Sequence, residues 1–248
     1  MKEKIVLITQ ARLGSKRFPE KILKKIGKEE LLSIHLKRLL CTKKVNSIVV
    51  ATTYEKGVEK IIDISKKNNV LFYQGSTQDV LSRFYYAALL EKADYVVRVT
   101  SDCPLLDPKL VDNVVQFTIE NNLDYCSNST LIQNYPDGQD VEVFKFYALK
   151  LAYENANSDF EREHVTPYII NNSNFKGGLK FKSAEYPLKK NYENIRMTID
   201  EKSDFDALKI LINHLGTKTD WKTYTKFIIN NPSLFTNQNI IRNVGSKI

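Results

Sequence analysis

The chain has 248 residues, of which 42% are hydrophobic and 27% are charged. This length and composition are typical of a globular chain with a buried core, and they argue against global disorder. The formal net charge of +8 fits either nucleic-acid binding or attraction of a polyanionic small molecule. Because the lysines are scattered and no long basic block occurs, we expect no nucleic acid partner.

The cysteines predict neither a disulfide framework nor a zinc site. Cys41, Cys103 and Cys126 are odd in number and widely spaced, and none belongs to a CxxC pattern. The apolar run near the N-terminus is too short for a signal peptide, and no segment approaches a membrane-spanning length. We therefore expect a cytoplasmic protein with no membrane partner.

The first half of the chain alternates apolar runs with segments of helical periodicity. Asp107 and Pro108 open one of these helices as its N-cap and its first residue. This alternation predicts an α/β fold, a mostly parallel open sheet with helices on both faces. Ligands of such sheets bind beyond the carboxyl ends of the strands. The predicted strands cover 5–9, 48–52, 70–73 and 95–100, and the predicted helices cover 29–40, 58–67 and 78–91.

The second half is less regular, and we expect it to form a β-rich arm over about 124–195 within a single domain spanning 1–248. A turn signal at 134–138 precedes one of its strands. We expect the asparagine-rich tail from Asn231 to order only against the body. The predicted strands cover 124–127, 140–144, 179–183 and 195–198, and the predicted helices cover 145–155, 161–170, 204–214 and 221–229.

The loop at 10–21 follows the first predicted strand directly and suits a triphosphate. A glycine lets the backbone approach a ligand, a serine hydroxyl donates a hydrogen bond, and an arginine grips phosphate oxygens with two parallel bonds. The Walker A order of residues is absent. A solvated basic loop is the alternative, but the position at a strand end favours a binding site. The loop contains Arg12, Gly14, Ser15, Lys16, Arg17 and Lys21.

Two aspartates follow predicted strands and are candidates for one metal site. Asp102 comes just after the strand at 95–100, and Asp200 just after the one at 195–198. Mg²⁺ prefers one or two protein carboxylates together with substrate phosphates. The alternative is that each aspartate only caps the structure that follows it. If both lie at the same edge of the sheet, they can converge on one ion.

Two further segments, 135–144 and 162–168, are dense in polar groups next to apolar ones. The first reads as a turn and a strand, and the second as a helix start that carries His164, one of three histidines. A lone histidine is more often structural than catalytic.

Several motifs follow one another along essentially the whole chain. In this order they resemble the cytidylyltransferases of the spore-coat polysaccharide biosynthesis type, which are related to the acylneuraminate and 3-deoxy-manno-octulosonate cytidylyltransferases. Family members act on different acceptors, so the resemblance does not name one. The motifs are Ala11-Arg12 with Ser15, Arg17, Pro19 and Lys21; Gly75-Ser76 with Asp79, Val80, Leu81 and Arg83; Asp102-Cys103-Pro104-Leu105 with Asp107-Pro108; Tyr135-Pro136-Asp137-Gly138 with 140–144; 162–168; Thr198 with Asp200; and Ile241-Arg242-Asn243.

The resemblance implies a nucleotide-diphosphosugar transferase-like fold that binds CTP and Mg²⁺. Asp102 and Asp200 would hold the metal, and Arg12, Lys21 and Asp102 would be the catalytic residues. Ser101 departs from the family, where glycine is expected, and it either crowds the nucleotide or adds a hydrogen bond. The implied nucleotide-binding residues are Ala11, Arg12, Gly14, Ser15, Lys16, Arg17, Lys21, Gly75, Ser76, Asp79, Arg83, Thr100 and Ser101.

The implied reaction joins the CMP part of CTP to a small anionic acceptor and releases pyrophosphate. The acceptor would be an acidic sugar or a phosphorylated polyol. Acidic side chains would bind its hydroxyls and basic ones its anionic group. The expected acceptor-binding residues are Asp137, Asp140, Glu142, Arg162 and His164.

Two other functions stay open at this point. A glycosyltransferase would use a nucleotide sugar and a DxD motif, but Ser101-Asp102-Cys103 stands there instead. A catalytically silent nucleotide-binding subunit would have no need to retain both metal-site aspartates. The resemblance also implies a homodimer, in which the apolar strands of the β-rich arm would be buried on both subunits. The alternative is that the arm folds back on its own domain.

Overall fold

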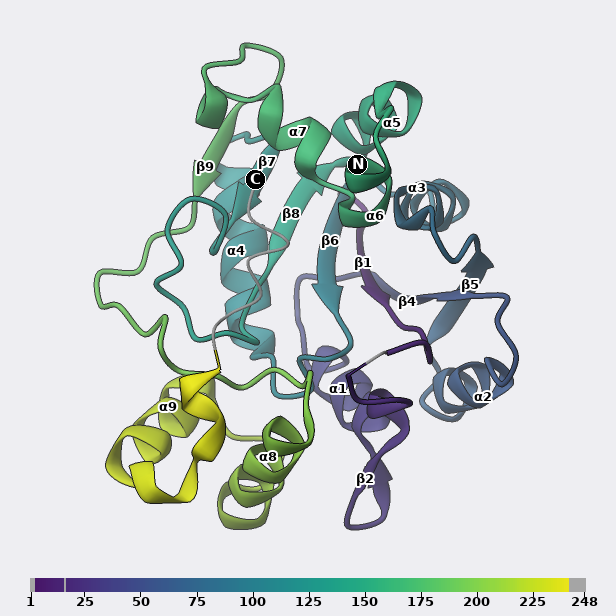
Figure 1. Ribbon diagram of the computed structural model, residues 1–248. Helices are drawn as coiled ribbons and strands as arrows, with labels where there is room; N and C mark the ends of the chain where they lie inside the picture. Colours follow the sequence, from purple (N-terminus) through teal and green to yellow (C-terminus); the bar gives the residue numbers. More distant parts are fainter. Residues whose placement is uncertain (1–2, 16, 241–248) are drawn as a thin grey trace.

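The computed structural model describes residues 3–15 and 17–240, and within them the chain builds one seven-stranded sheet in the order β5-β4-β1-β6-β8-β7-β9 (Figure 1). The four strands from β5 to β6 are parallel to one another, whereas β8 runs antiparallel to both β6 and β7. This confirms the predicted α/β class. The strands are β1 (Ile5–Gln10), β4 (Ser47–Thr53), β5 (Leu71–Gly75), β6 (Tyr95–Thr100), β7 (Tyr125–Ser127), β8 (Glu142–Lys145) and β9 (Ser183–Glu185), and a small hairpin pairs β2 (Lys25–Ile26) with β3 (Glu29–Glu30).

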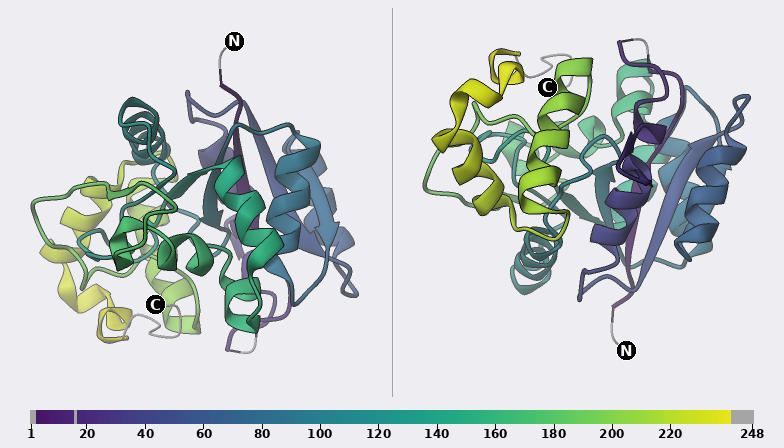
Figure 2. Two further views of the ribbon diagram at one scale, coloured as in Figure 1. Left: turned by 90° about the horizontal axis from the view of Figure 1, so that it is seen from above. Right: turned by 90° about the horizontal axis from the view of Figure 1, so that it is seen from below.

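Helices cover both faces of this sheet (Figure 2). Successive side chains of a strand point to opposite faces, so in β1 Leu7 packs in one apolar cluster, while Val6 and Ile8 pack in the other. Helices α1, α2 and α4 contribute to the first cluster, and α3, α5 and α7 to the second. The helices of these layers are α1 (Leu31–Leu39), α2 (Glu59–Lys67), α3 (Val80–Leu90), α4 (Pro108–Glu120), α5 (Phe146–Asn155), α6 (Asp159–His164) and α7 (Pro167–Asn171).

The C-terminal segments form a third layer beside the main sheet. Helices α8 (Lys202–Leu215) and α9 (Trp221–Asn230) share an apolar cluster with Met197, Ile199 and residues of α1. The short helices η3 (Pro232–Leu234) and η4 (Thr236–Asn239) follow, and Phe235 and Asn237 are buried against this layer. The described part of the asparagine-rich tail therefore orders against the body, while Ile241-Arg242-Asn243 lie outside the described residues.

The strands of the expected β-rich arm continue the central sheet. β8 pairs with β6 in the register Val97 to Val143, β7 pairs with β8, and β9 is the outermost strand. The later strands therefore do not form a separate arm, because they extend the block of parallel strands that ends with β6. An antiparallel strand can follow its neighbour without a helix between them. Strands and helices therefore alternate less regularly in the sequence of this half of the sheet.

Three predicted elements are corrected by the structure. The helix expected over 161–170 is two helices, α6 and α7. Val165 adopts a positive φ of 72° between them, and Pro167 starts the second helix because it has no N–H to continue the first. The strand expected over 179–183 is instead β9, and 195–198 pairs only through a single bridge from Arg196 to Asp137. The short helices η1 (Lys21–Leu23) and η2 (Asn174–Lys176) were not predicted.

No helix in the described part of the chain has both the length and the apolar character that crossing a membrane requires.

Candidate active site

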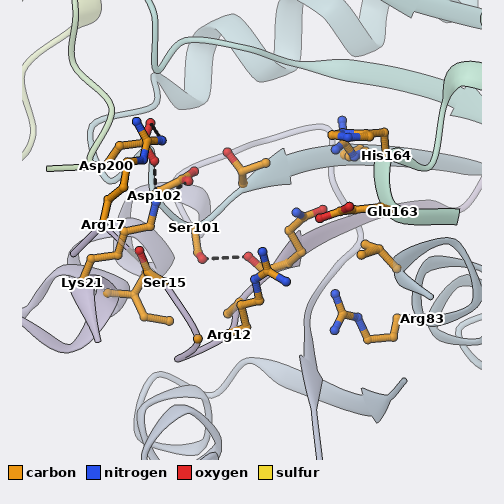
Figure 3. Close-up of a pocket in the computed structure, with 17 residues that line it drawn as sticks. Arg12, Ser15, Arg17, Lys21, Arg83, Ser101, Asp102, Glu163, His164 and Asp200 are labelled. Atoms are coloured by element: carbon orange, nitrogen blue, oxygen red, sulfur yellow. Dashed lines mark hydrogen bonds and ion pairs between the residues drawn. The ribbon is translucent and has the colours of Figure 1, made fainter. Parts of the chain in front are cut away.

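A cavity of about 620 Å³ opens at the carboxyl ends of β1 and β6 (Figure 3). The two strands are adjacent and parallel, with Gln10 opposite Thr100, so the loops that leave them start at the same level. Most of the residues expected to bind the nucleotide or the metal line this cavity, and Lys16 lies outside the described residues. The lining consists of Gln10, Ala11, Arg12, Gly14, Ser15, Arg17, Lys21, Ile22, Val80, Arg83, Arg98, Thr100, Ser101, Asp102, Glu163, His164 and Asp200.

The two loops at the floor of this cavity are tied together by hydrogen bonds. Ser101 Oγ donates to the carbonyl oxygen of Gln10 at 2.7 Å, so the serine at this position adds a hydrogen bond. Glu55 accepts from the backbone N–H of Leu13 at 2.6 Å and holds the first loop from the side of β4. These contacts fix the main chain, and the basic side chains of the loop project into the cavity.

The Lys21 ammonium lies between the two aspartates expected to hold a metal. Its Nζ donates to Asp102 Oδ2 at 2.8 Å, to Asp200 Oδ1 at 2.9 Å and to the carbonyl oxygen of Ile199 at 2.6 Å. Burial of Lys21 opposes its charge, but the two carboxylates outweigh burial and raise its pKa. The same ion pair outweighs burial at Asp102 and lowers the pKa of that carboxyl.

These two aspartates fit a divalent cation. One oxygen of each lies within 2.9 Å of a single cationic atom, Lys21 Nζ, which stands where a metal ion would bind. Among the described residues no cluster of three or more His, Cys, Asp or Glu could hold a metal. A pair of carboxylates is the donor set that Mg²⁺ uses when substrate phosphates complete its shell.

A buried guanidinium holds Asp200 from the other side. Arg196 donates to Asp137 Oδ2 at 2.7 Å, to Asp200 Oδ2 at 3.2 Å and to both carboxylate oxygens of Asp204. Burial would lower the pKa of Arg196, but its bonds to Asp204 and the charge of Asp137 raise it instead. The Gln238 side chain bonds both the N–H and the carbonyl of Arg196, so the C-terminal layer braces this arginine.

Arg83 is a second buried arginine, and it reaches the cavity from α3. It is 1% exposed, its Nη1 donates to the carbonyl oxygen of Ser76 at 3.0 Å, and its Nε has no hydrogen-bond partner among the described residues. Burial, followed by the charge of Arg12, lowers the pKa of Arg83 to about 10. A Cβ on Gly75 would lie 2.8 Å from Arg83 Cγ. The Ser76 carbonyl therefore holds Arg83, Gly75 leaves room for its side chain, and Asp79 caps α3; none of these three lines the cavity.

His35, in α1, is hydrogen-bonded to the loop that carries Asp102. Its Nδ1 lies 3.0 Å from the carbonyl oxygen of Cys103, which can only accept, so Nδ1 carries the proton and Nε2 accepts from Thr9 Oγ1. Burial lowers the pKa of His35 to about 4, and the ring is therefore neutral at physiological pH. Sequence patterns gave no signal for this role, because a histidine in an amphipathic helix carries no mark of its partners.

A second cavity of about 580 Å³ adjoins the first, since Arg98, Thr100 and His164 line both. Burial is the main cause that lowers the pKa of His164, and the charge of Arg98 adds to it. Of the expected acceptor-binding residues, Asp140, Glu142 and His164 line this second cavity. The others in its lining are Val99, Ser129, Thr130, Leu131, Gln133, Thr166, Pro167, Ile170, Lys176 and Glu193.

Two residues expected in the acceptor site lie elsewhere among the described residues. Arg162 donates to the carbonyl oxygens of Tyr153 and Ala156 at the end of α5, because those carbonyls have no partner within the helix. Asp137 is held by Arg196. Conversely, Arg98 and Glu163 line the first cavity although the sequence motifs did not single them out as binding residues.

Comparison with known proteins identifies the family. A family model described as cytidylyltransferase matches residues 6–231. This chain belongs to the cytidylyltransferase family. It is therefore a CTP-dependent nucleotidyltransferase, and the resemblance stated from the sequence motifs is confirmed.

Three known proteins are similar to this chain over most of its length. The protein MJ1063 of Methanocaldococcus jannaschii is 40% identical over 98% of this cytidylyltransferase and 97% of its own length. The spore coat polysaccharide biosynthesis protein SpsF of Bacillus subtilis is 32% identical over 87% of this chain and 89% of its own length. A solved cytidylyltransferase structure from Leptospira borgpetersenii superposes with a TM-score of 0.89 at 33% identity, covering 97% of this chain and all of that one.

Proposed function

We propose that this cytidylyltransferase transfers CMP from CTP to an acidic sugar or a phosphorylated polyol, with release of pyrophosphate, in the synthesis of a surface polysaccharide or another glycan. The observation that supports this most strongly is the pair of adjoining cavities, which meet at Arg98, Thr100 and His164. One has a basic loop and two convergent carboxylates, and the other combines acidic, basic and hydroxyl side chains. A nucleotide and an acceptor bound in them would face each other at the junction.

In this proposal the first cavity holds CTP. Arg12, Arg17 and Lys21 would bind the outer phosphates, because guanidinium and ammonium groups match phosphate oxygens in charge and geometry. The guanidinium of Arg83 offers only donors, so it suits the acceptor atoms of the cytosine ring. It lies at the opposite end of the cavity from Asp200 in the view of Figure 3.

The second cavity would bind the acceptor. Glu142 is held by an ion pair with Arg98 and by hydrogen bonds from the hydroxyls of Tyr125 and Thr166, so its carboxylate is fixed toward the cavity. Arg98 and Lys176 would attract the anionic group of the acceptor, and Asp140 would bind its hydroxyls.

The reaction in this proposal is an in-line displacement. The acceptor oxygen attacks the α-phosphorus of CTP while the bond to the pyrophosphate oxygen breaks, and the bond electrons leave with pyrophosphate. A phosphate or carboxylate oxygen is already ionised, so its attack needs no strong general base, whereas a sugar hydroxyl would release its proton to water as it attacks. Asp102 and Asp200 would hold Mg²⁺, which neutralises phosphate charge when bound. The protein itself contributes positioning and charge.

The test is a pyrophosphate-release screen of ATP, CTP, GTP and UTP against a panel of acidic sugars and polyol phosphates. We expect release with CTP only, and only when one class of anionic acceptor is present. In a parallel incubation with nucleotide sugars and the same acceptors, transfer of the sugar would instead support the glycosyltransferase alternative. Nucleotide binding without turnover across the panel would support a silent subunit.

A further inference from the structure

The Lys21 ammonium has no hydrogen-bonding capacity left for a ligand in this structure. An ammonium has three N–H donors, and Lys21 Nζ contacts three acceptors, on Asp102, Asp200 and Ile199. The Lys21 side chain is 13% exposed. A lysine that binds phosphate must therefore first give up at least one of these bonds.

The main chain at Lys21 is fixed, so the side chain is the part that can move. Lys21 starts the short helix η1, where its carbonyl accepts from Lys24 N at 3.2 Å, and the next residue, Ile22, is 2% exposed. A lysine has four rotatable carbons between its backbone and its charge. Its Nζ can therefore swing from the aspartates into the cavity that Lys21 lines without any change of fold.

The charges around Asp200 show why this lysine matters for a metal. Asp200 already pairs with Arg17 at 3.1 Å and with Arg196 at 3.2 Å in addition to Lys21. For Asp102 the structure gives one cationic partner among the described residues, Lys21. A divalent ion placed between the two carboxylates would meet the Lys21 ammonium at nearly the same point, and the two cations would repel each other.

We propose that Lys21 is a tethered counter-ion, which fills the cation position between Asp102 and Asp200 in the free protein and exchanges with a divalent cation when a polyphosphate offers its ammonium new partners. This inference rests on the proposed function. The exchange of Lys21 makes the divalent ion and the polyphosphate bind cooperatively, because each favours the state in which the Lys21 ammonium has left the aspartates. The free protein then binds divalent ions weakly.

The first experiment measures Mn²⁺ binding without any nucleotide, by titration calorimetry and by the electron paramagnetic resonance of free Mn²⁺. The variant Lys21→Met keeps the length of the side chain and removes its charge. We expect this variant to bind Mn²⁺ at least about tenfold more tightly than the unaltered protein, because a like charge next to the ion is gone. The matched control is Lys25→Met, which removes an equal charge from a lysine on the nearby β2 that is 58% exposed and pairs with Glu30. The control should leave Mn²⁺ affinity unchanged.

The second part adds inorganic tripolyphosphate as the probe. In the unaltered protein, we expect saturating tripolyphosphate to raise Mn²⁺ affinity by a factor about fivefold larger than it does in Lys21→Met, since the variant has no ammonium to transfer. Equal or weaker Mn²⁺ binding by Lys21→Met without tripolyphosphate would overturn the proposal. So would an equal tripolyphosphate effect in the two proteins.

A third measurement observes the unaltered protein directly. It keeps the proposal testable if Lys21→Met fails to fold. Lysine ¹⁵N resonances report the hydrogen bonding of each ammonium, and the variant Lys21→Gln serves to assign Lys21. We expect a Lys21 signal protected from exchange in the free protein that shifts when Mg²⁺ and tripolyphosphate are added together. A signal that stays unchanged at saturation would refute the exchange. None of these readouts requires an acceptor or turnover, so the exchange can fail while pyrophosphate release from CTP persists, and the reverse.

Discussion

Asp102 and Asp200 show at the scale of single residues how the site balances charge. Asp200 is held by three cationic side chains, and Arg196 is itself 4% exposed and surrounded by carboxylates. A buried guanidinium whose three nitrogens all bond to carboxylates fixes the geometry of its partners, and removing it would leave buried carboxylates unpaired. The position of Asp200 is therefore set by the protein before any ligand binds, while Asp102 is held mainly by Lys21.

The first prediction concerns Asp102. Asp102→Asn should reduce turnover on the order of a hundredfold or more, because it removes charge that stabilises the reacting phosphorus through the metal. Thermal unfolding should show an intact fold. The control is Asp206→Asn, which neutralises a carboxylate on α8 that is 52% exposed and pairs with Lys202. Near-normal turnover in Asp102→Asn would rule out the proposed role.

A second prediction concerns Arg17, whose side chain is 45% exposed and lines the cavity next to Asp200. Arg17→Ala should weaken CTP binding much more than CMP binding, because its contacts are expected on the outer phosphates that CMP lacks. Titration of the same variant with both nucleotides supplies an internal control. An equal loss for CTP and CMP would place Arg17 elsewhere on the nucleotide.

At the scale of elements, the segment between β7 and β8 depends on a carboxyl group from the edge strand β9. Glu185 accepts from the backbone N–H of Thr130 at 3.0 Å and of Leu131 at 3.2 Å. Thr130 and Leu131 line the second cavity. The side of the cavity that we assign to the acceptor is therefore held by a strand about fifty residues further along the chain.

The third prediction concerns the pH dependence of this contact. Burial raises the pKa of Glu185 to about 7, although its backbone hydrogen bonds act in the opposite direction. Between the ordinary glutamate pKa of about 4.3 and this value, the folded state binds more protons than the unfolded state, so the unfolding free energy contributed by Glu185 falls as pH rises. Compared with Glu185→Gln, the unaltered protein should lose about 3 kcal/mol of unfolding free energy over this range, and only about 0.4 kcal/mol more above pH 7.

Denaturant unfolding of both proteins between pH 5 and about pH 8.5 measures this difference. Glu154→Gln is the matched control, because Glu154 is exposed on α5 and its removal should not alter the pH profile. Parallel profiles for the unaltered protein and Glu185→Gln would contradict the prediction.

These elements also show how far sequence reasoning reaches. The strands β1, β4 and β6 are mostly apolar runs buried on both faces, and the ligand loops follow from their parallel order, so both were predictable. The edge strand β5 is largely exposed or half-buried. The break between α6 and α7 was missed because the helical periodicity continues across Val165 and Pro167. Arg196 and Glu185 were missed as structural partners because a charged residue in the sequence does not reveal which distant backbone or carboxylate it meets. Those partners are set by packing between segments far apart in the chain.

At the scale of the whole molecule, the half of the sheet from β8 to β9 is buried by its own chain, but the segments that connect its strands are partly exposed. Its strands belong to the main sheet, and Tyr125 and Phe144 are fully buried on the same chain. The strands therefore need no second subunit to cover them. Apolar side chains of the connecting segments are nevertheless exposed, with Leu131 at 49%, Ile132 at 56% and Leu179 at 101%.

The last prediction is a homodimer formed through these segments. A twofold interface would bury the same exposed apolar side chains on both subunits. Sedimentation at micromolar protein should then give about twice the chain mass of 28.6 kDa. Ile132→Asp should shift the equilibrium toward the monomer, because a charge in such an interface would be desolvated without a partner. Leu90→Asp is the matched control, since Leu90 is 70% exposed on α3, outside 124–195. A mass of one chain in the unaltered protein, or an equal shift by both variants, would show that these segments do not form the interface.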